Sequence, residues 1–305
     1  MRASLQAMTS TDRLRRLPPL RKGHPPTADM LAARADTVAP ASAMSAVRVE
    51  RLTMGGVPCL VCEPPEVAAT FLYFHGGGYW RGRPAMWTSL ASRVALQARA
   101  RVILPDYSLA PERPFPAAVH DATNVYLSLE PSSNDIFAGG ESAGGGLAAS
   151  LALAIRRCDL PPLAGVALVS PWLDLTLEAK SYSVNAARDK VFGREAAQRY
   201  AAWYLQGHDS TDELVSPLHS DPTGFPPTLL MVGTEEVLLD DSLEFARRLA
   251  VARSSVELHV MVGMQHAWPI VQQDIAETEF AIERISAHIE HAQRRASPEI
   301  RPIIL

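Results

Sequence analysis

The sequence predicts an α/β fold in which a mostly parallel, eight-stranded central sheet carries helices on both faces. Eight short apolar runs rich in β-branched residues recur along the chain, and helix-length patterns lie between most of them. Two strand patterns come first and strand–helix alternation follows, which is the order that buries a parallel sheet between helices. A chain of 305 residues is long enough for one large domain of this kind.

The elements are expected in the following order. Strands are predicted at residues 47–54, 57–62, 70–75, 101–105, 135–139, 164–170, 228–233 and 256–262. Helices are predicted at residues 86–99, 117–129, 143–157, 240–252 and 275–293. The core domain then covers residues 46–305.

Two segments interrupt this alternation. Residues 1–45 are rich in Ala, Pro and Arg and show no strand pattern, and an insertion at about 174–226 holds aromatic residues and one helical pattern at 196–205. We expect both to form a helical cap over the carboxyl edge of the sheet, where folds of this class bind ligands.

Composition excludes several classes of protein. The net charge of −4 and the lack of a basic stripe argue against nucleic-acid binding. The longest apolar run, residues 147–155, is far shorter than the roughly 18 residues of a membrane span, and residues 1–20 lack the apolar stretch of a secretory signal. An odd, small number of cysteines favours a reducing compartment, so we expect a cytoplasmic protein. Cys59 and Cys62 lie three apart in a predicted strand and therefore face opposite sides, which argues against a redox or zinc pair.

The motif GESAG at residues 140–144 follows a predicted strand and precedes a helix rich in Ala and Leu. In this context the central Ser142 is expected on a sharp strand-to-helix turn, where a Cβ at either flanking glycine would collide with neighbouring backbone. The hydroxyl then projects beside the helix N-terminus, which favours developing negative charge. The pattern predicts a nucleophile, although G-x-S-x-G alone also occurs in ordinary turns.

A second glycine-rich motif, HGGGYW at residues 75–80, follows an earlier predicted strand. Consecutive glycines at this point allow backbone N–H groups to turn toward a ligand and to stabilise a tetrahedral oxyanion. The alternative is a flexible glycine turn.

A serine nucleophile in this architecture is followed along the chain by its acid and then by its histidine base. His266 lies in a short loop after the last predicted strand and is the best-placed base. The loop after the preceding strand offers four carboxylates. Glu235 and Glu236 lie nearer the strand end, whereas Asp240 and Asp241 are expected in the first turn of a helix.

These motifs together resemble the bacterial hormone-sensitive-lipase-like esterases of the α/β-hydrolase superfamily. The resemblance rests on residues 75–80, 106–117, 140–145 and 263–268, with SPWLD at 170–174 and SPL at 216–218. It implies that Ser142 is the nucleophile and His266 the base. It also implies an oxyanion hole formed by the N–H groups of Gly77, Gly78 and Ala143. Glu236 occupies the place where the family usually has an aspartate.

The resemblance further implies a serine carboxylesterase acting on short-chain esters, without metal or organic cofactor, and a homodimer formed through the last strand or the terminal helix. The only other expected partner is a small ester substrate. We expect Tyr79, Trp80, Trp203 and Trp268 to line the substrate pocket. Two rival functions remain: an arylformamidase or amidase, and a non-catalytic small-molecule receptor on the same fold. The presence of His266 argues against the receptor.

Overall fold

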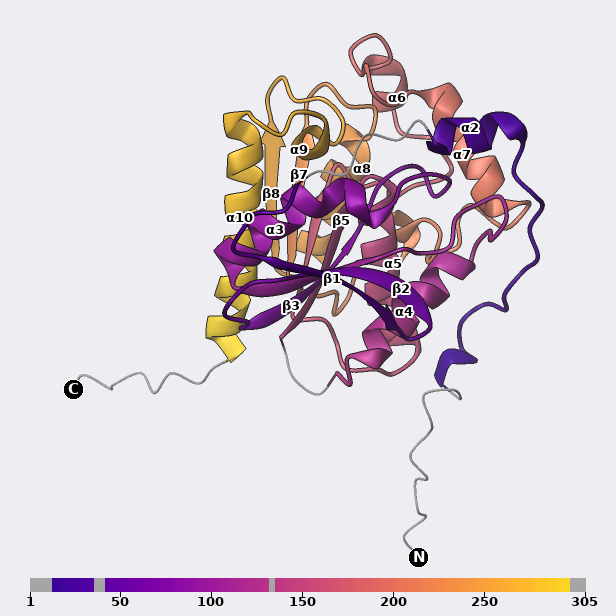
Figure 1. Ribbon diagram of the computed structural model, residues 1–305. Coiled ribbons are helices and arrows are strands. Elements are labelled where there is room, and N and C mark those ends of the chain that lie inside the picture. Colours follow the sequence, from indigo (N-terminus) through magenta and orange to yellow (C-terminus); the bar gives the residue numbers. More distant parts are fainter. Residues whose placement is uncertain (1–12, 36–41, 132–134, 297–305) are drawn as a thin grey trace, which may run out of the picture.

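The computed structural model describes residues 13–35, 42–131 and 135–296, and it contains the predicted eight-stranded, mostly parallel sheet (Figure 1). The strand order is β1-β2-β4-β3-β5-β6-β7-β8. Strand β2 is antiparallel to both of its neighbours, β1 and β4, and the remaining pairs are parallel. The strands are β1 (Arg48–Met54), β2 (Val57–Glu63), β3 (Ala69–Phe74), β4 (Ala100–Pro105), β5 (Ile136–Glu141), β6 (Gly165–Val169), β7 (Thr228–Gly233) and β8 (Val256–Met261).

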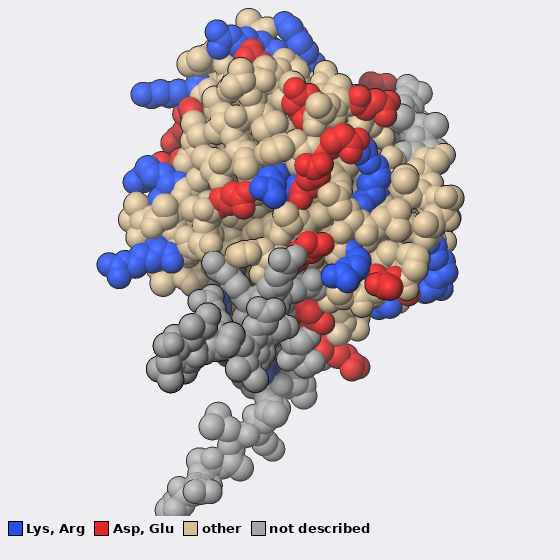
Figure 2. Space-filling view, turned by 90° about the vertical axis from the view of Figure 1, so that its left-hand side faces the viewer, with Lys and Arg blue, Asp and Glu red and all other residues tan. Residues whose placement is uncertain are grey.

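Helices cover both faces of the sheet and bury two separate apolar cores. Helices α3 (Thr88–Ala98) and α10 (Ala276–Ala296) pack on one face, while α4 (Ala117–Ser128), α5 (Ala143–Arg157) and α8 (Leu239–Val251) pack on the other. Cys59 belongs to the core of the second face and Cys62 to that of the first, so the two thiols point to opposite sides as predicted. Figure 2 shows acidic and basic side chains interspersed on the face that carries α10.

The element boundaries differ from the predicted ones at two places that matter for the site. Strand β5 continues to Glu141, because Gly140 and Glu141 still pair with Leu168 and Val169 of β6. Tertiary pairing therefore overrides the weak strand propensity of these two residues. The helix expected at 86–99 is preceded by a separate 3₁₀ turn, η1 (Pro84–Trp87).

The insertion at 174–226 contains α6 (Ser181–Val184), α7 (Arg194–Leu205) and η2 (Pro217–His219), and no strand is assigned within it. Helix α2 (Ala28–Ala35), from the N-terminal segment, lies beside α7 at the same end of the molecule (Figure 1). Arg34 fixes α2 there through paired hydrogen bonds to the carboxylate of Glu112 and a 2.7 Å bond to the Trp80 carbonyl. The rest of the expected N-terminal cap, residues 1–12 and 36–41, falls outside the described residues. Within the described ranges, no helix combines the length and apolar character that a bilayer span requires.

Candidate active site

Ser142 lies at the sharp turn between β5 and α5. Its backbone angles, φ 55° and ψ −126°, are strained for a residue with a side chain, and its N–H donates a 3.1 Å hydrogen bond to the Val169 carbonyl. A Cβ at Gly140 or Gly144 would collide with the carbonyl oxygen of Phe74 at the end of β3. The tight approach of β3 to the turn thus requires both glycines, and it leaves the Ser142 hydroxyl at the carboxyl edge of the sheet.

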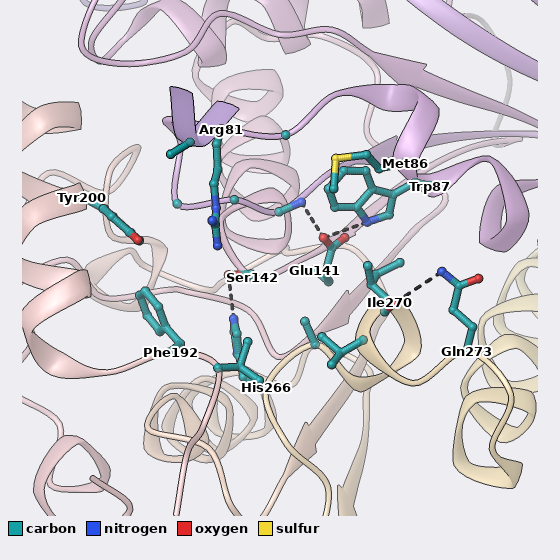
Figure 3. A pocket seen from close by; sticks show the side chains of 18 of the residues that line it. Arg81, Met86, Trp87, Glu141, Ser142, Phe192, Tyr200, His266, Ile270 and Gln273 are labelled. Carbon is teal, nitrogen blue, oxygen red and sulfur yellow. Dashed lines mark hydrogen bonds between the residues drawn. The ribbon is translucent and has the colours of Figure 1, made fainter. Parts of the chain in front are cut away.

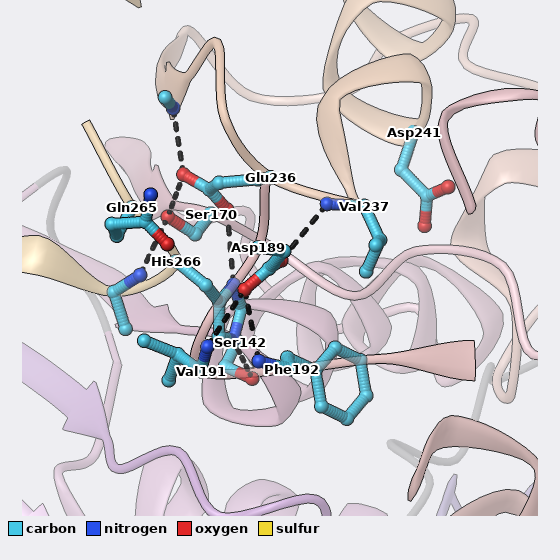
Figure 4. Close-up of polar contacts among 12 residues, drawn as sticks. Ser142, Ser170, Asp189, Val191, Phe192, Glu236, Val237, Asp241, Gln265 and His266 are labelled. Carbon is cyan, nitrogen blue, oxygen red and sulfur yellow. Dashed lines mark hydrogen bonds and ion pairs between the residues drawn. The ribbon is translucent and has the colours of Figure 1, made fainter. Parts of the chain in front are cut away.

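Three side chains from three different loops meet at this edge. The Ser142 hydroxyl lies 2.8 Å from Nε2 of His266, which follows β8. On the other side of the ring, Nδ1 of His266 lies 2.9 Å from Oε2 of Glu236, which follows β7 (Figure 4). All three residues are buried, and Glu236 is completely inaccessible. The arrangement has the geometry of a nucleophile, a base and an orienting acid.

The Glu236 carboxylate is held by further donors. Its Oε1 accepts hydrogen bonds from the Ser170 hydroxyl at 2.7 Å and from the Gly233 N–H at 2.6 Å. Oε2 is therefore left for His266. Asn185 donates to the backbone carbonyl of Glu236 at 2.7 Å and so ties this loop to the insertion.

The electrostatic environment favours a basic imidazole. Burial by itself would lower the pKa of His266, but the hydrogen bond to Glu236 and the negative charges of Glu236, Asp189 and Glu141 outweigh it and raise that pKa. A charged carboxylate on Nδ1 stabilises the imidazolium that forms when the ring accepts a proton.

The other carboxylates of the loop after β7 point elsewhere. Asp240 accepts a 2.8 Å hydrogen bond from the Ser181 N–H, and Asp241 accepts bonds from the N–H groups of Leu173 and Asp174. Both lie in the first turn of α8, as predicted. Figure 4 shows Asp241 apart from the His266 ring. Glu235 contacts the Thr234 hydroxyl instead.

The glycine loop after β3 lies beside Ser142. Gly77 and Gly78 have positive φ angles of 113° and 62°, and Ala143 is the first residue of α5. In the described part of the chain, the N–H groups of these three residues have no hydrogen-bond acceptor. Free N–H groups at a helix N-terminus and in a glycine loop are suited to stabilise an oxyanion.

Glu141 connects this loop to the turn that holds Ser142. Its side chain accepts hydrogen bonds from the Gly76 N–H at 2.5 Å, the Trp87 indole at 2.9 Å and the Tyr73 hydroxyl at 2.9 Å. Burial raises the pKa of Glu141 to about 7, although these donors lower it. The Glu141 carboxylate thus fixes the start of the glycine loop through its hydrogen bond with the Gly76 N–H.

Ser142 and His266 open into a pocket of about 910 Å³. The labelled side chains of Arg81, Phe192 and Tyr200 lie on one side of Ser142, and those of Met86, Trp87 and Ile270 lie on the other (Figure 3). Ala33 of α2 also contributes to the wall, so the N-terminal segment, the insertion and the sheet domain all border the pocket.

None of the four aromatic residues expected in the pocket lines it, which corrects that prediction. Trp268 is fully buried against α10, where its indole donates to the Glu277 carbonyl, because the left-handed Ala267 before it starts α9 (Trp268–Val271) in that direction. Tyr79 is buried and stacks on Tyr204 with ring centroids 4.0 Å apart.

Trp80 and Trp203 lie behind the pocket wall. Their rings contact one another at 5.2 Å, and both pack against Tyr200, which is the residue that faces the cavity. These two tryptophans support the wall rather than form it.

Comparison with known proteins identifies this architecture. A protein-family model, described as an alpha/beta hydrolase fold, matches residues 71–270, about two thirds of the chain. The chain belongs to the α/β-hydrolase family. Within it, the expected likeness to bacterial hormone-sensitive-lipase-like esterases is confirmed by solved structures. One, an esterase of that bacterial family, is 33% identical over 87% of this chain and 96% of its own, with a TM-score of 0.80.

Curated relatives point the same way. An acetyl-hydrolase of Streptomyces hygroscopicus is 36% identical over 73% of this chain and 76% of its own length. An esterase of Acinetobacter venetianus is 39% identical over 71% of this chain and 76% of its own.

Several residues of this α/β hydrolase were not predicted to contribute to the site. Phe192 stacks on the His266 ring at 5.2 Å, and Asp189 positions it by accepting the Phe192 N–H at 2.9 Å. Asp189 also accepts the Val237 N–H, next to Glu236. Ser170 had one signal in the sequence, its place as the first residue of SPWLD at the end of a predicted strand. No set of three or more His, Cys, Asp or Glu side chains is placed to hold a metal ion in the described ranges.

Proposed function

We propose that the protein is a serine carboxylesterase that hydrolyses short-chain carboxylic esters through an acyl-enzyme intermediate. The observation that carries this proposal is the continuous hydrogen-bonded chain from Ser142 through His266 to Glu236. The relatives named as esterases support the reaction class.

In the acylation step, Nε2 of His266 accepts the hydroxyl proton of Ser142 while Oγ attacks the ester carbonyl carbon. The carbonyl oxygen becomes an oxyanion, which the N–H groups of Gly77, Gly78 and Ala143 stabilise. The C–O bond to the alcohol then breaks. The alcohol leaves with the proton from His266, and the acyl group stays on Ser142.

Deacylation repeats these steps with water. His266 accepts a proton from the water as its oxygen attacks the acyl-enzyme, and it returns that proton to Oγ as the carboxylic acid leaves. Throughout the cycle the Glu236 carboxylate accepts the hydrogen bond from Nδ1–H, keeps that tautomer and stabilises the transient imidazolium.

The preference for short chains is supported by bulky side chains close to Ser142. Phe192 is buried against the base on one side, and Trp87 is held by Glu141 on the other. Each methylene that finds apolar contact contributes up to roughly 0.8 kcal/mol, so the rate should rise with acyl length only until these walls are reached. We expect an optimum between about C2 and C6, because longer chains would extend past these walls and gain no further contact.

One panel tests this function. p-Nitrophenyl esters from C2 to C16 are assayed with the wild type and with Ser142→Ala, and stopped-flow measurement of the first turnover seeks a burst of one p-nitrophenol per chain. We expect a burst with short esters and a loss of at least about 10⁴ in kcat in the variant. Undiminished turnover by folded Ser142→Ala would exclude the mechanism, and rates rising steadily to C16 would exclude the short-chain preference. p-Nitroacetanilide in the same panel distinguishes an amidase.

A further inference from the structure

The pocket contains a cation and a hydroxyl that the proposed mechanism does not use. Arg81 lines the cavity, and its side chain points into it above Ser142 (Figure 3). Tyr200 of α7 lines the same side, and its hydroxyl points toward the space near Arg81 (Figure 3). Within the described ranges, neither the Arg81 guanidinium nor the Tyr200 hydroxyl has a hydrogen-bond or ion-pair partner. Two donors therefore lie on the same side of the cavity (Figure 3).

Trp80 holds both groups in place. The guanidinium carbon of Arg81 lies 5.5 Å from the centre of the Trp80 ring, a cation–π distance, and the Tyr200 ring packs against the same indole at 5.3 Å. The stem of Arg81 also lies against the glycine loop, since its Cγ is 3.2 Å from the position of a Cβ at Gly77. The guanidinium is thus positioned next to the reacting centre before any ligand binds.

The negative charges of the pocket do not neutralise Arg81. Glu141 is engaged by three donors, as described above. Asp274 also lines the pocket, and among the described residues it forms no ion pair with Arg81. The positive charge of Arg81 thus faces the cavity without a carboxylate partner among the described residues.

We propose that Arg81 and Tyr200 form a subsite for a carboxylate, and that the preferred substrates are short esters carrying a carboxylate a few bonds from the scissile ester. This inference rests on the proposed esterase function and names its substrate class. A guanidinium offers two parallel N–H donors that match the two oxygens of a carboxylate, and a phenol adds a third donor. Arg81 is exposed, and a bound ester would cover it and strengthen the ion pair.

The carboxylate can belong to the acyl part or to the alcohol part of the ester, and two substrate pairs separate these cases. Monomethyl glutarate carries it in the acyl part and is compared with its neutral amide, methyl 4-carbamoylbutanoate. 4-Acetoxybutanoate carries it in the alcohol part and is compared with 4-acetoxybutanamide. Acid release is followed by pH-stat at pH 8, where both carboxylates are ionised. The measured quantity is the ratio of kcat/KM for the anionic ester to that for its amide.

We expect the wild type to prefer the anionic member of at least one pair by roughly tenfold, the effect of one hydrogen bond to a charged group. Arg81→Gln should reduce this ratio to about one or below, Arg81→Lys should retain part of it, and Tyr200→Phe should lower it by about two- to threefold, as expected for a weaker neutral donor. Added NaCl should also reduce the wild-type ratio.

Arg83→Gln is the matched control, since Arg83 is exposed two residues further on and lines a different cavity beside Asp106. Its ratio should equal that of the wild type. A wild-type ratio of one or below, or a ratio unchanged in Arg81→Gln, would overturn the subsite. Such a result leaves the esterase proposal intact as long as Ser142→Ala loses turnover of the neutral amide-bearing esters. Turnover that survives in Ser142→Ala would overturn the esterase proposal instead.

Discussion

Nδ1 of His266 lies 2.9 Å from Oε2 of Glu236, and the other oxygen of that carboxylate is occupied by the Ser170 hydroxyl and the Gly233 N–H. These three contacts fix one orientation of the carboxylate and one tautomer of the ring. The loop after β7 that carries this glutamate is tied to the insertion by Asn185, whose amide donates to the Glu236 carbonyl at 2.7 Å.

Glu236→Gln should reduce kcat by about 10⁴, the loss seen when the acid of a serine protease becomes an amide. The glutamine would keep its oxygen on the Ser170 and Gly233 donors and present its NH₂ to Nδ1. That contact favours the tautomer with hydrogen on Nε2, which cannot accept the proton of Ser142. Steady-state kinetics with p-nitrophenyl butyrate measures the effect.

Asp240→Asn is the control for this prediction, because Asp240 bonds the Ser181 N–H rather than the ring. Its kcat should stay within a few fold of the wild type, with a loss of about 1 kcal/mol in stability from the weakened hydrogen bond. An inactive Asp240→Asn together with an active Glu236→Gln would show that Asp240, not Glu236, is the acid.

Local steric rules made much of the site predictable from the sequence. The glycines around Ser142, the glycine loop after β3 and the order of nucleophile, acid and base along the chain each depend on a few consecutive residues. Their convergence at one edge follows from the parallel sheet, because the carboxyl ends of parallel strands share an edge.

The pocket walls were not predictable in the same way. Phe192 and Tyr200 reach the site only through the path of the insertion, which has no strand periodicity and is fixed by Asp189 and Asn185. Trp268 follows the base directly in sequence, yet one left-handed residue turns it into the core. Aromatic residues near a sequence motif therefore indicate packing. Predicting which residues line the pocket also requires the long-range contacts of the insertion.

Gly144→Ala should destabilise the protein by at least about 2 kcal/mol and abolish activity, because the new Cβ meets the backbone of Phe74 and His75 rather than a movable side chain. Gly193→Ala is its control: the added Cβ has no neighbour within 4 Å and φ is −134°. The free energy of unfolding of Gly193→Ala should lie within about 0.5 kcal/mol of that of the wild type. Urea denaturation followed by circular dichroism compares the two. Equal stability of the two variants would show that β3 does not approach the turn so closely.

Glu141 should make the stability of the protein depend on pH. Its folded pKa of about 7 lies above the ordinary value of 4.5, so between these two pH values the folded state binds more protons than the unfolded state. The stabilising contribution is complete below pH 4.5 and is lost as the pH rises through 7, with a total change of about 3 kcal/mol.

Glu141→Gln removes this titration while its amide oxygen still accepts the Gly76 N–H. We therefore expect the free energy of unfolding of the wild type, relative to Glu141→Gln, to fall by about this amount between pH 4.5 and 7.5 in urea denaturation. Glu283→Gln, an exposed carboxylate on α10, should show no comparable change. If the difference in free energy of unfolding between the wild type and Glu141→Gln is constant over this range, Glu141 is ionised in the folded protein throughout. Its three hydrogen-bond donors then stabilise the charge despite burial.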